Sequence, residues 1–177
     1  MKITLSIIAL LLVSNLQNFA QNQLFEKVAP AVRKKMNYAL YKYYDVKDAF
    51  VESNSSKIVA KAELFSKALQ EIPTDIMETE QKEYFMAQKA IIDSHIVFLL
   101  RTTFIREQRE HFNQISLAFY KIVKSFKANQ FEAYLQYCWM AREGDTQDAY
   151  WISSEKKIVN PYLPETMLHC GKIADSF

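Results

Sequence analysis

The chain has 177 residues, half of them hydrophobic, and a formal net charge of +2 at pH 7. This length and composition allow one domain with a buried core, which excludes an intrinsically disordered protein. The small net charge, with basic residues spread along the chain, lacks the electrostatic footprint of a nucleic-acid-binding protein, so no nucleic-acid partner is expected. Only two glycines and four prolines occur, which favours long helices.

Residues 1–20 have the pattern of a cleavable secretory signal. Lys2 supplies a positive N-terminal region, an apolar run extends from Ile3 to Val13, and Ala20 lies where cleavage is expected. An uncleaved anchor or an ordinary buried helix is the alternative, but the run is shorter than the roughly 20 apolar residues that span a bilayer. We therefore expect an exported protein whose residues 21–177 form a single domain without a membrane span.

Apolar residues recur at helical spacing after Leu24 and predict an up-and-down helical bundle. The expected helices run from just after Pro30 to near Ser53, from Ser56 to Ile72, from Thr74 or Asp75 to the Thr102–Thr103 pair, and from about Phe104 onward. Asn54 or Ser55 is a suitable N-cap for the second helix, and Pro73 ends it.

After Gln130 the pattern changes to that of β-strands. The segments Ala133–Ala141 and Ala149–Ile152 are rich in aromatic residues and flank a polar stretch with Gly144, which predicts a β-hairpin. Ser153 or Ser154 can cap a short helix, and Glu165–Cys170 is expected to form one or two helical turns closed by Gly171. The expected fold is therefore mainly α: a bundle of about four helices, a C-terminal β-hairpin and a short helical turn.

Four sulfur-containing residues near the C-terminus suggest a metal site. Cys138 and Met140 are two apart in an expected strand and therefore project from the same face. Met167 and Cys170 are three apart in an expected helical turn and share a face there. If the two segments pack together, two thiols and two thioethers converge, and this is the ligand set that selects Cu(I).

The two cysteines also allow a structural interpretation. In the oxidising compartment that an exported protein enters, two cysteines usually form a disulfide. A Cys138–Cys170 bond would close a loop of about 32 residues, worth roughly 3.5–4 kcal/mol in the chain-entropy model. Met140 and Met167 would then fill the hydrophobic core. The two interpretations do not exclude each other, because a reducible cysteine pair could bind a metal ion only in its reduced state.

Histidines are the remaining candidate ligands. His169 is adjacent to Cys170, and His111 lies beside the apolar stripe of the expected fourth helix. At such a position a histidine is usually half-buried and hydrogen-bonded. The alternative is that it acts as a metal ligand or as a pH-sensitive group. The same two alternatives apply to His95. The sequence contains no glycine-rich phosphate loop, no zinc-protease helix motif and no nucleophile elbow, so we expect no enzymatic activity.

Several of these segments resemble motifs of the bacterial domain-of-unknown-function 3347 family. The similar segments are Tyr43–Ala49, Gln108–Phe112, Tyr120–Lys124, Gln136–Ala141, Tyr150–Glu155, Ile158–Tyr162 and Met167–Gly171. The resemblance spans roughly Met36 to Lys172 and is closest in the C-terminal segments. The family is functionally uncharacterised and occurs in exported bacterial proteins, alone or appended to periplasmic adaptor subunits of heavy-metal efflux systems.

The resemblance implies a location in the bacterial periplasm or cell envelope, with heavy-metal efflux components or a metal ion as partners. It aligns Cys138, Met140, Met167 and Cys170 with the family's Cys-Pro-Met and Met-x-x-Cys-Gly elements, and His111 with a helix histidine. This chain departs from the family at Trp139, where proline is usual, and at His169, where lysine is usual. The resemblance favours a protein that binds or senses Cu(I); a non-enzymatic interaction domain with a disulfide staple is the alternative.

Overall fold

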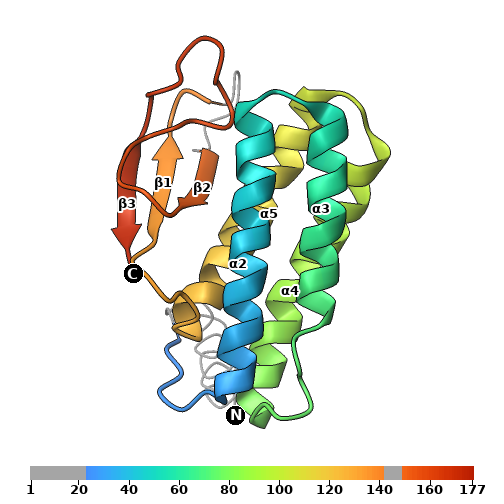
Figure 1. The fold of residues 1–177 in the computed structure, drawn as a ribbon, viewed down its shortest axis with the longest axis vertical. Helices are drawn as coiled ribbons and strands as arrows, with labels where there is room; N and C mark the ends of the chain where they lie inside the picture. The colour runs from blue at the N-terminus through green and yellow to red at the C-terminus, as the bar shows by residue number, and fades with distance from the viewer. Residues whose placement is uncertain (1–22, 142–148) are drawn as a thin grey trace, which may run out of the picture.

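The computed structural model describes residues 23–141 and 149–177, so the expected signal sequence and the polar hairpin stretch with Gly144 lie outside the described residues. Within these ranges, four α-helices precede a three-stranded antiparallel sheet (Figure 1). The prediction of a mainly α fold with about four helices is confirmed. No helix in the described part of the chain combines the length and apolarity needed to cross a bilayer.

The helices follow local sequence signals and are α2 (Pro30–Val51), α3 (Ser55–Gln70), α4 (Thr79–Arg101) and α5 (Ile105–Ser125). Pro30 occupies the first turn of α2, where its missing N–H has no intrahelical partner to lose. Asn54 caps α3 by accepting a hydrogen bond from the Lys57 N–H at 2.9 Å, as expected. The third helix begins later than the expected Thr74–Asp75, because the Gln81 side chain accepts the Glu78 N–H and caps the chain there.

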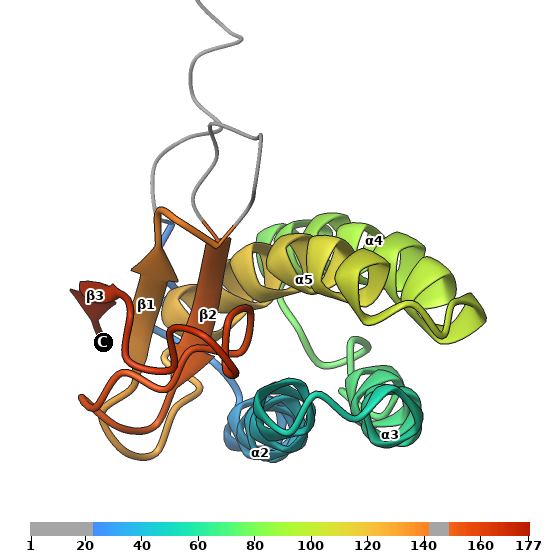
Figure 2. The ribbon, with the colours of Figure 1, turned by 90° about the horizontal axis from the view of Figure 1, so that it is seen from above.

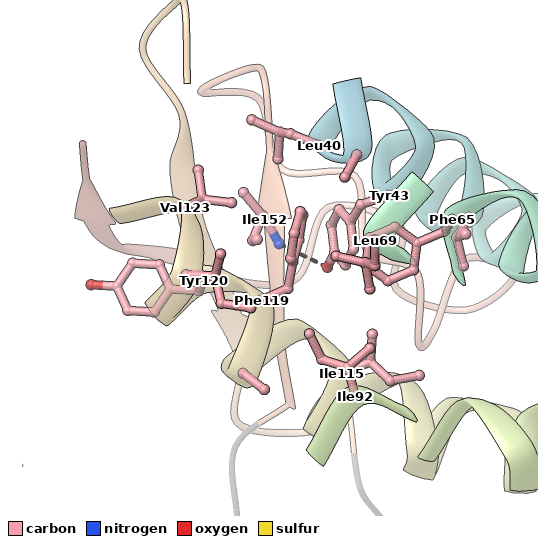
Figure 3. Packing of buried hydrophobic residues seen from close by; sticks show 14 of the residues in the cluster. Leu40, Tyr43, Phe65, Leu69, Ile92, Ile115, Phe119, Tyr120, Val123 and Ile152 are labelled. Carbon is pink, nitrogen blue, oxygen red and sulfur yellow. Dashed lines mark hydrogen bonds between the residues drawn. The ribbon is translucent and has the colours of Figure 1, made fainter. Parts of the chain in front are cut away.

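The helices pack as two inclined pairs. α2 lies along α3, and α4 lies along α5. Seen from above, α2 and α3 appear end-on whereas α4 and α5 cross the view (Figure 2). Buried aromatic rings fill the space between the pairs: Phe65 meets Phe119 edge-on with centroids 4.9 Å apart, and both approach Tyr43 (Figure 3). Burial of these rings, together with the aliphatic residues around them, stabilises the bundle.

The sheet consists of β1 (Tyr134–Cys138), β2 (Ala149–Ser153) and β3 (Lys172–Ser176) in the order β2-β1-β3. The expected hairpin is confirmed, since β1 pairs antiparallel with β2. The third strand was not expected from the sequence. Its five residues carry no aromatic run and four of them are exposed, so pairing with β1, rather than local propensity, makes the segment extended.

The expected short helix after Ser153 and the helical turns over Glu165–Cys170 are wrong. Residues 154–171 form bends and isolated turns, and the chain then extends to pair β3 with β1. Gly171 makes this change of direction possible with a φ of +147°, because a Cβ at this position would lie 2.8 Å from the Tyr137 carbonyl oxygen. Helical continuation past residue 170 would forfeit the strand pairing.

The bundle covers the open edge of β2. The Ile152 N–H donates to the Tyr43 hydroxyl at 3.1 Å (Figure 3). That hydroxyl lies 2.6 Å from the Ser116 hydroxyl. The Tyr150 N–H donates to the Asn113 side chain at 2.8 Å. Side chains of α2 and α5 thus take the place of a fourth strand, which fixes how the sheet sits on the helices.

Candidate functional site

The two cysteines meet at one end of the sheet. Cys138 is the last residue of β1 and is fully buried, whereas Cys170 lies two residues before β3 and is half-buried. Their Sγ atoms are 2.8 Å apart and both thiols are free. The pairing of β1 with β3 causes this contact, because it places Tyr137 opposite Lys172 and so brings the two cysteine segments side by side.

Asn160 holds the loop that carries Cys170. It is fully buried, and its Nδ2 donates to the Cys170 carbonyl oxygen at 2.9 Å. Its Oδ1 accepts the backbone N–H groups of Tyr162 and Leu163 at 2.8 and 3.1 Å. Asn160 belongs to the family-like segment Ile158–Tyr162 but was not among the expected site residues. The Asn-Pro dipeptide is the sequence signal that could have indicated it, since an Asn side chain often organises the turn that follows.

The surroundings of the thiol pair act on the protonation of Cys138. Burial and the hydrogen bond with Cys170 raise the pKa of the Cys138 thiol. Donation to its sulfur from the Met140 N–H and the Asn160 side chain lowers the pKa but does not outweigh these effects. The raised pKa keeps Cys138 a thiol at neutral pH, so an ion that binds its sulfur has to displace a proton.

Both methionines reach the surface close to the thiols. β1 ends at Cys138, so Met140 lies in the following turn, and Met167 also lies outside any helix; the expected shared strand face and helix face are wrong. Met140 is 48% exposed and Met167 is 39% exposed, which excludes the core-filling role considered above. Backbone contacts still tie them to the pair, because the Met140 N–H donates to Cys138 Sγ and the Met167 carbonyl accepts the Cys170 N–H at 3.0 Å.

The structure places the two candidate histidines in different surroundings. His111, on α5, lies with its Nδ1 3.0 Å from the Nδ1 of His95 on α4, and its ring stacks on Phe98. Burial and the neighbouring His111 lower the pKa of His95. His169 is exposed, with its Nδ1 2.8 Å from the Ile158 carbonyl oxygen in the Cys170 loop. His111 thus contacts residues of α4, whereas His169 contacts the loop that carries Cys170.

Across residues 23–141 and 149–177, no cluster of three or more His, Cys, Asp or Glu side chains is arranged to hold a metal ion. The thiol pair therefore offers two ligands of this kind. Among the residues that the structure describes, a further protein ligand at that end of the sheet has to be of another type, and the two methionine thioethers are the soft atoms attached to the same turns.

A protein-family model described as "Protein of unknown function (DUF3347)" matches residues 39–131. Comparison with curated proteins and with solved structures gives no match. The matched segment includes most of the helical bundle, with Tyr43 and His111, and it ends before β1 begins. The thiol pair therefore lies outside the matched residues.

Proposed function

The chain belongs to the DUF3347 family, whose function is unknown, and from the geometry of its thiol pair we propose that it binds a soft metal ion such as Cu(I). In this proposal it is a non-catalytic protein exported to the bacterial cell envelope, where heavy-metal efflux components are its partners. The observation that supports it is the contact between Cys138 and Cys170, whose sulfurs lie 2.8 Å apart at the end of β1.

The four sulfur residues fit a soft ion. Thiolates and thioethers select Cu(I) over harder cations, and an arrangement of two thiols with methionines on the same turns supplies both. Cys170 is half-buried and the methionines are exposed, so an ion can reach the pair from solvent. Cys138 loses its proton on binding, and because its pKa is raised, the affinity for Cu(I) should increase as the pH rises above neutral.

Titration of the reduced protein with Cu(I) under anaerobic conditions, against a chromogenic Cu(I) chelator, tests the proposal. We expect one equivalent of Cu(I) per chain and loss of this binding in Cys138→Ser. Met140→Leu and Met167→Leu preserve side-chain volume and should weaken binding. Met86→Leu is the matched control, because Met86 is equally exposed but lies on α4. Absence of saturable binding by the reduced protein would contradict the proposal.

Export is tested separately by cell fractionation and mass spectrometry. We expect a mature chain that begins near Gln21 in the envelope fraction, and an intact chain in the cytoplasm would contradict export.

The alternative function is a disulfide-stapled interaction domain, and the same sulfur contact favours it. In a thiol–disulfide exchange, Cys138 and Cys170 would form the S–S bond while a disulfide-bearing oxidant is reduced to a dithiol. The alternative predicts no free thiols in protein isolated from the envelope and unfolded before the assay. It also predicts a loss of roughly 3.5–4 kcal/mol of stability on reduction. Two free thiols in that protein would exclude it.

A further inference from the structure

A second cluster of ligand-type side chains lies in the bundle, where α4 meets α5. His95 and His111 come from the two helices and face each other through the same ring atom, with their Nδ1 nitrogens 3.0 Å apart. Both side chains are half-buried, so neither is sealed in the core. Phe98 stacks on the His111 ring with centroids 5.1 Å apart and an interplanar angle of 11°, which restrains the plane of the imidazole.

The spacing of the two nitrogens suits a shared cation. An ion in tetrahedral geometry at about 2.0–2.1 Å from each imidazole nitrogen holds the two nitrogens roughly 3.3–3.4 Å apart. The observed 3.0 Å is a few tenths of an ångström shorter. A small separation of α4 and α5 would therefore open the distance between the two Nδ1 atoms to the one that a shared ion needs.

A surface cavity of about 360 Å³ reaches the His111 side of this pair. His111 forms part of its wall, together with Phe98, Arg101, Thr102, Thr103, Phe104 and Glu107. Glu107 lies one turn before His111 on α5, and its carboxylate accepts a hydrogen bond from the Thr102 hydroxyl at 2.6 Å. The Glu107 carboxylate favours a bound cation electrostatically, whereas the positive charge of Arg101 disfavours it. The cavity leaves room for water ligands.

We propose that His95 and His111 form a metal site distinct from the thiol pair, which binds a borderline divalent cation such as Zn²⁺ through their two Nδ1 atoms. Imidazole nitrogen suits zinc, nickel and copper in their divalent states, whereas the thiol pair suits a soft ion. Because the described residues contain no cluster of three such ligands, water completes the coordination. The site lies within the segment matched by the family model, whereas the thiols do not.

The test is a Zn²⁺ titration by calorimetry of the full chain carrying Cys138→Ser and Cys170→Ser, which removes the thiols as competing ligands. We expect one equivalent of Zn²⁺, and affinity at least tenfold lower when His95→Asn or His111→Asn is added. His169→Asn is the matched control and should leave the affinity unchanged, because His169 bonds to the Ile158 carbonyl in a different part of the fold.

A second measurement does not depend on the folding of the histidine variants. In ¹⁵N spectra of the chain with both Cys→Ser changes, Zn²⁺ should shift the Nδ1 resonances of His95 and His111 together and leave those of His169 in place. The proposal is overturned if Zn²⁺ does not saturate, if only His169 responds, or if either histidine substitution leaves the affinity unchanged. Cu(I) binding by the thiols is measured on the unsubstituted chain, so the failure of one site is distinguishable from failure of the other.

Discussion

The bundle and the C-terminal module (residues 133–141 and 149–177) are held together by different kinds of interaction. In the bundle, buried aromatic rings such as Phe65, Phe119 and Tyr43 pack against one another across the helix pairs. In the module, β2 joins the same apolar core through Trp151 and Ile152, but single polar side chains hold the outer segments: Asn160 organises the Cys170 loop, and Asp175 attaches β3 to α5. The Cys170 loop and β3 therefore depend on a few directed hydrogen bonds, and the bundle depends on a large apolar area.

This difference bears on where function resides. An apolar core tolerates many sequences of similar side-chain volume. A contact between two thiols requires a particular backbone conformation of the loop that carries Cys170. The family model matches 39–131 and so describes the bundle, while the thiol pair belongs to the module. The shared part of the chain thus provides the scaffold and the His95–His111 pair, and the module adds the sulfur chemistry that we propose for this chain.

The largest expected effect comes from a cavity in the bundle. Phe65→Ala removes a ring that is 1% exposed and contacts Phe119 and Tyr43, so we expect a loss of about 3–5 kcal/mol of unfolding free energy. Because the module packs on the bundle, both regions should unfold at the same, lower urea concentration. Circular dichroism follows the helices, and the fluorescence of buried Trp151 follows the module. Leu64→Ala is the control, since Leu64 is 48% exposed and should change stability by no more than about 0.5 kcal/mol.

The next effect should be confined to the module. Asn160→Ala leaves the Tyr162 and Leu163 N–H groups and the Cys170 carbonyl without their partner, which costs roughly 2–4 kcal/mol after partial replacement by water. We expect alkylation of Cys170 to accelerate at least tenfold while the bundle helices stay protected from hydrogen exchange.

Asn54→Ala is the matched control for this prediction. It removes the cap of α3 in the bundle and should cost about 1 kcal/mol without changing thiol labelling. Equal labelling rates in the two variants would show that Asn160 does not hold the loop.

A smaller effect is expected at the joint between the two regions. Tyr43→Phe keeps the buried ring but leaves the Ile152 N–H without an acceptor, which costs about 1–3 kcal/mol. The Ser116 hydroxyl keeps its bond to the Phe112 carbonyl, so the loss is limited to one group. Exchange of the Ile152 amide should accelerate more than that of amides in the centre of α5. The exposed Tyr41→Phe should leave this exchange unchanged.

The smallest effect depends on pH. Burial pushes the pKa of the Asp175 carboxyl up, but hydrogen bonds from Lys124 and Tyr120 outweigh it and hold the pKa below its usual value. The stabilisation is therefore complete above the unfolded pKa of about 3.9 and is lost as the pH falls through the lower folded value.

Acidification below about pH 4 should accordingly loosen β3 by less than about 1 kcal/mol while the bundle persists. Hydrogen exchange of the β3 amides measures this, and Asp175→Asn should remove the pH dependence. An unchanged acid profile in Asp175→Asn would show that another carboxyl is responsible.

Local patterns in the sequence were sufficient for the helices and the hairpin, because those elements form between residues close in the chain. Asn54 and Pro30 mark helix starts by interactions within one turn, and their positions were predicted. The cysteines were recognised as candidates by residue type, yet the reason given for their convergence was wrong, since neither Met140 nor Met167 lies on the expected strand or helix.

Only the tertiary structure decided which side chains meet. The third strand, the Asn160 contacts, the Cys138–Cys170 contact and the His95–His111 pair join segments that are far apart in sequence or on different helices. Such contacts depend on strand register and helix packing, which arise when the whole chain folds and leave no periodic trace in a local window. Composition and spacing therefore specify a mainly α bundle with reactive side chains, and the packing of the chain determines which of those side chains form sites.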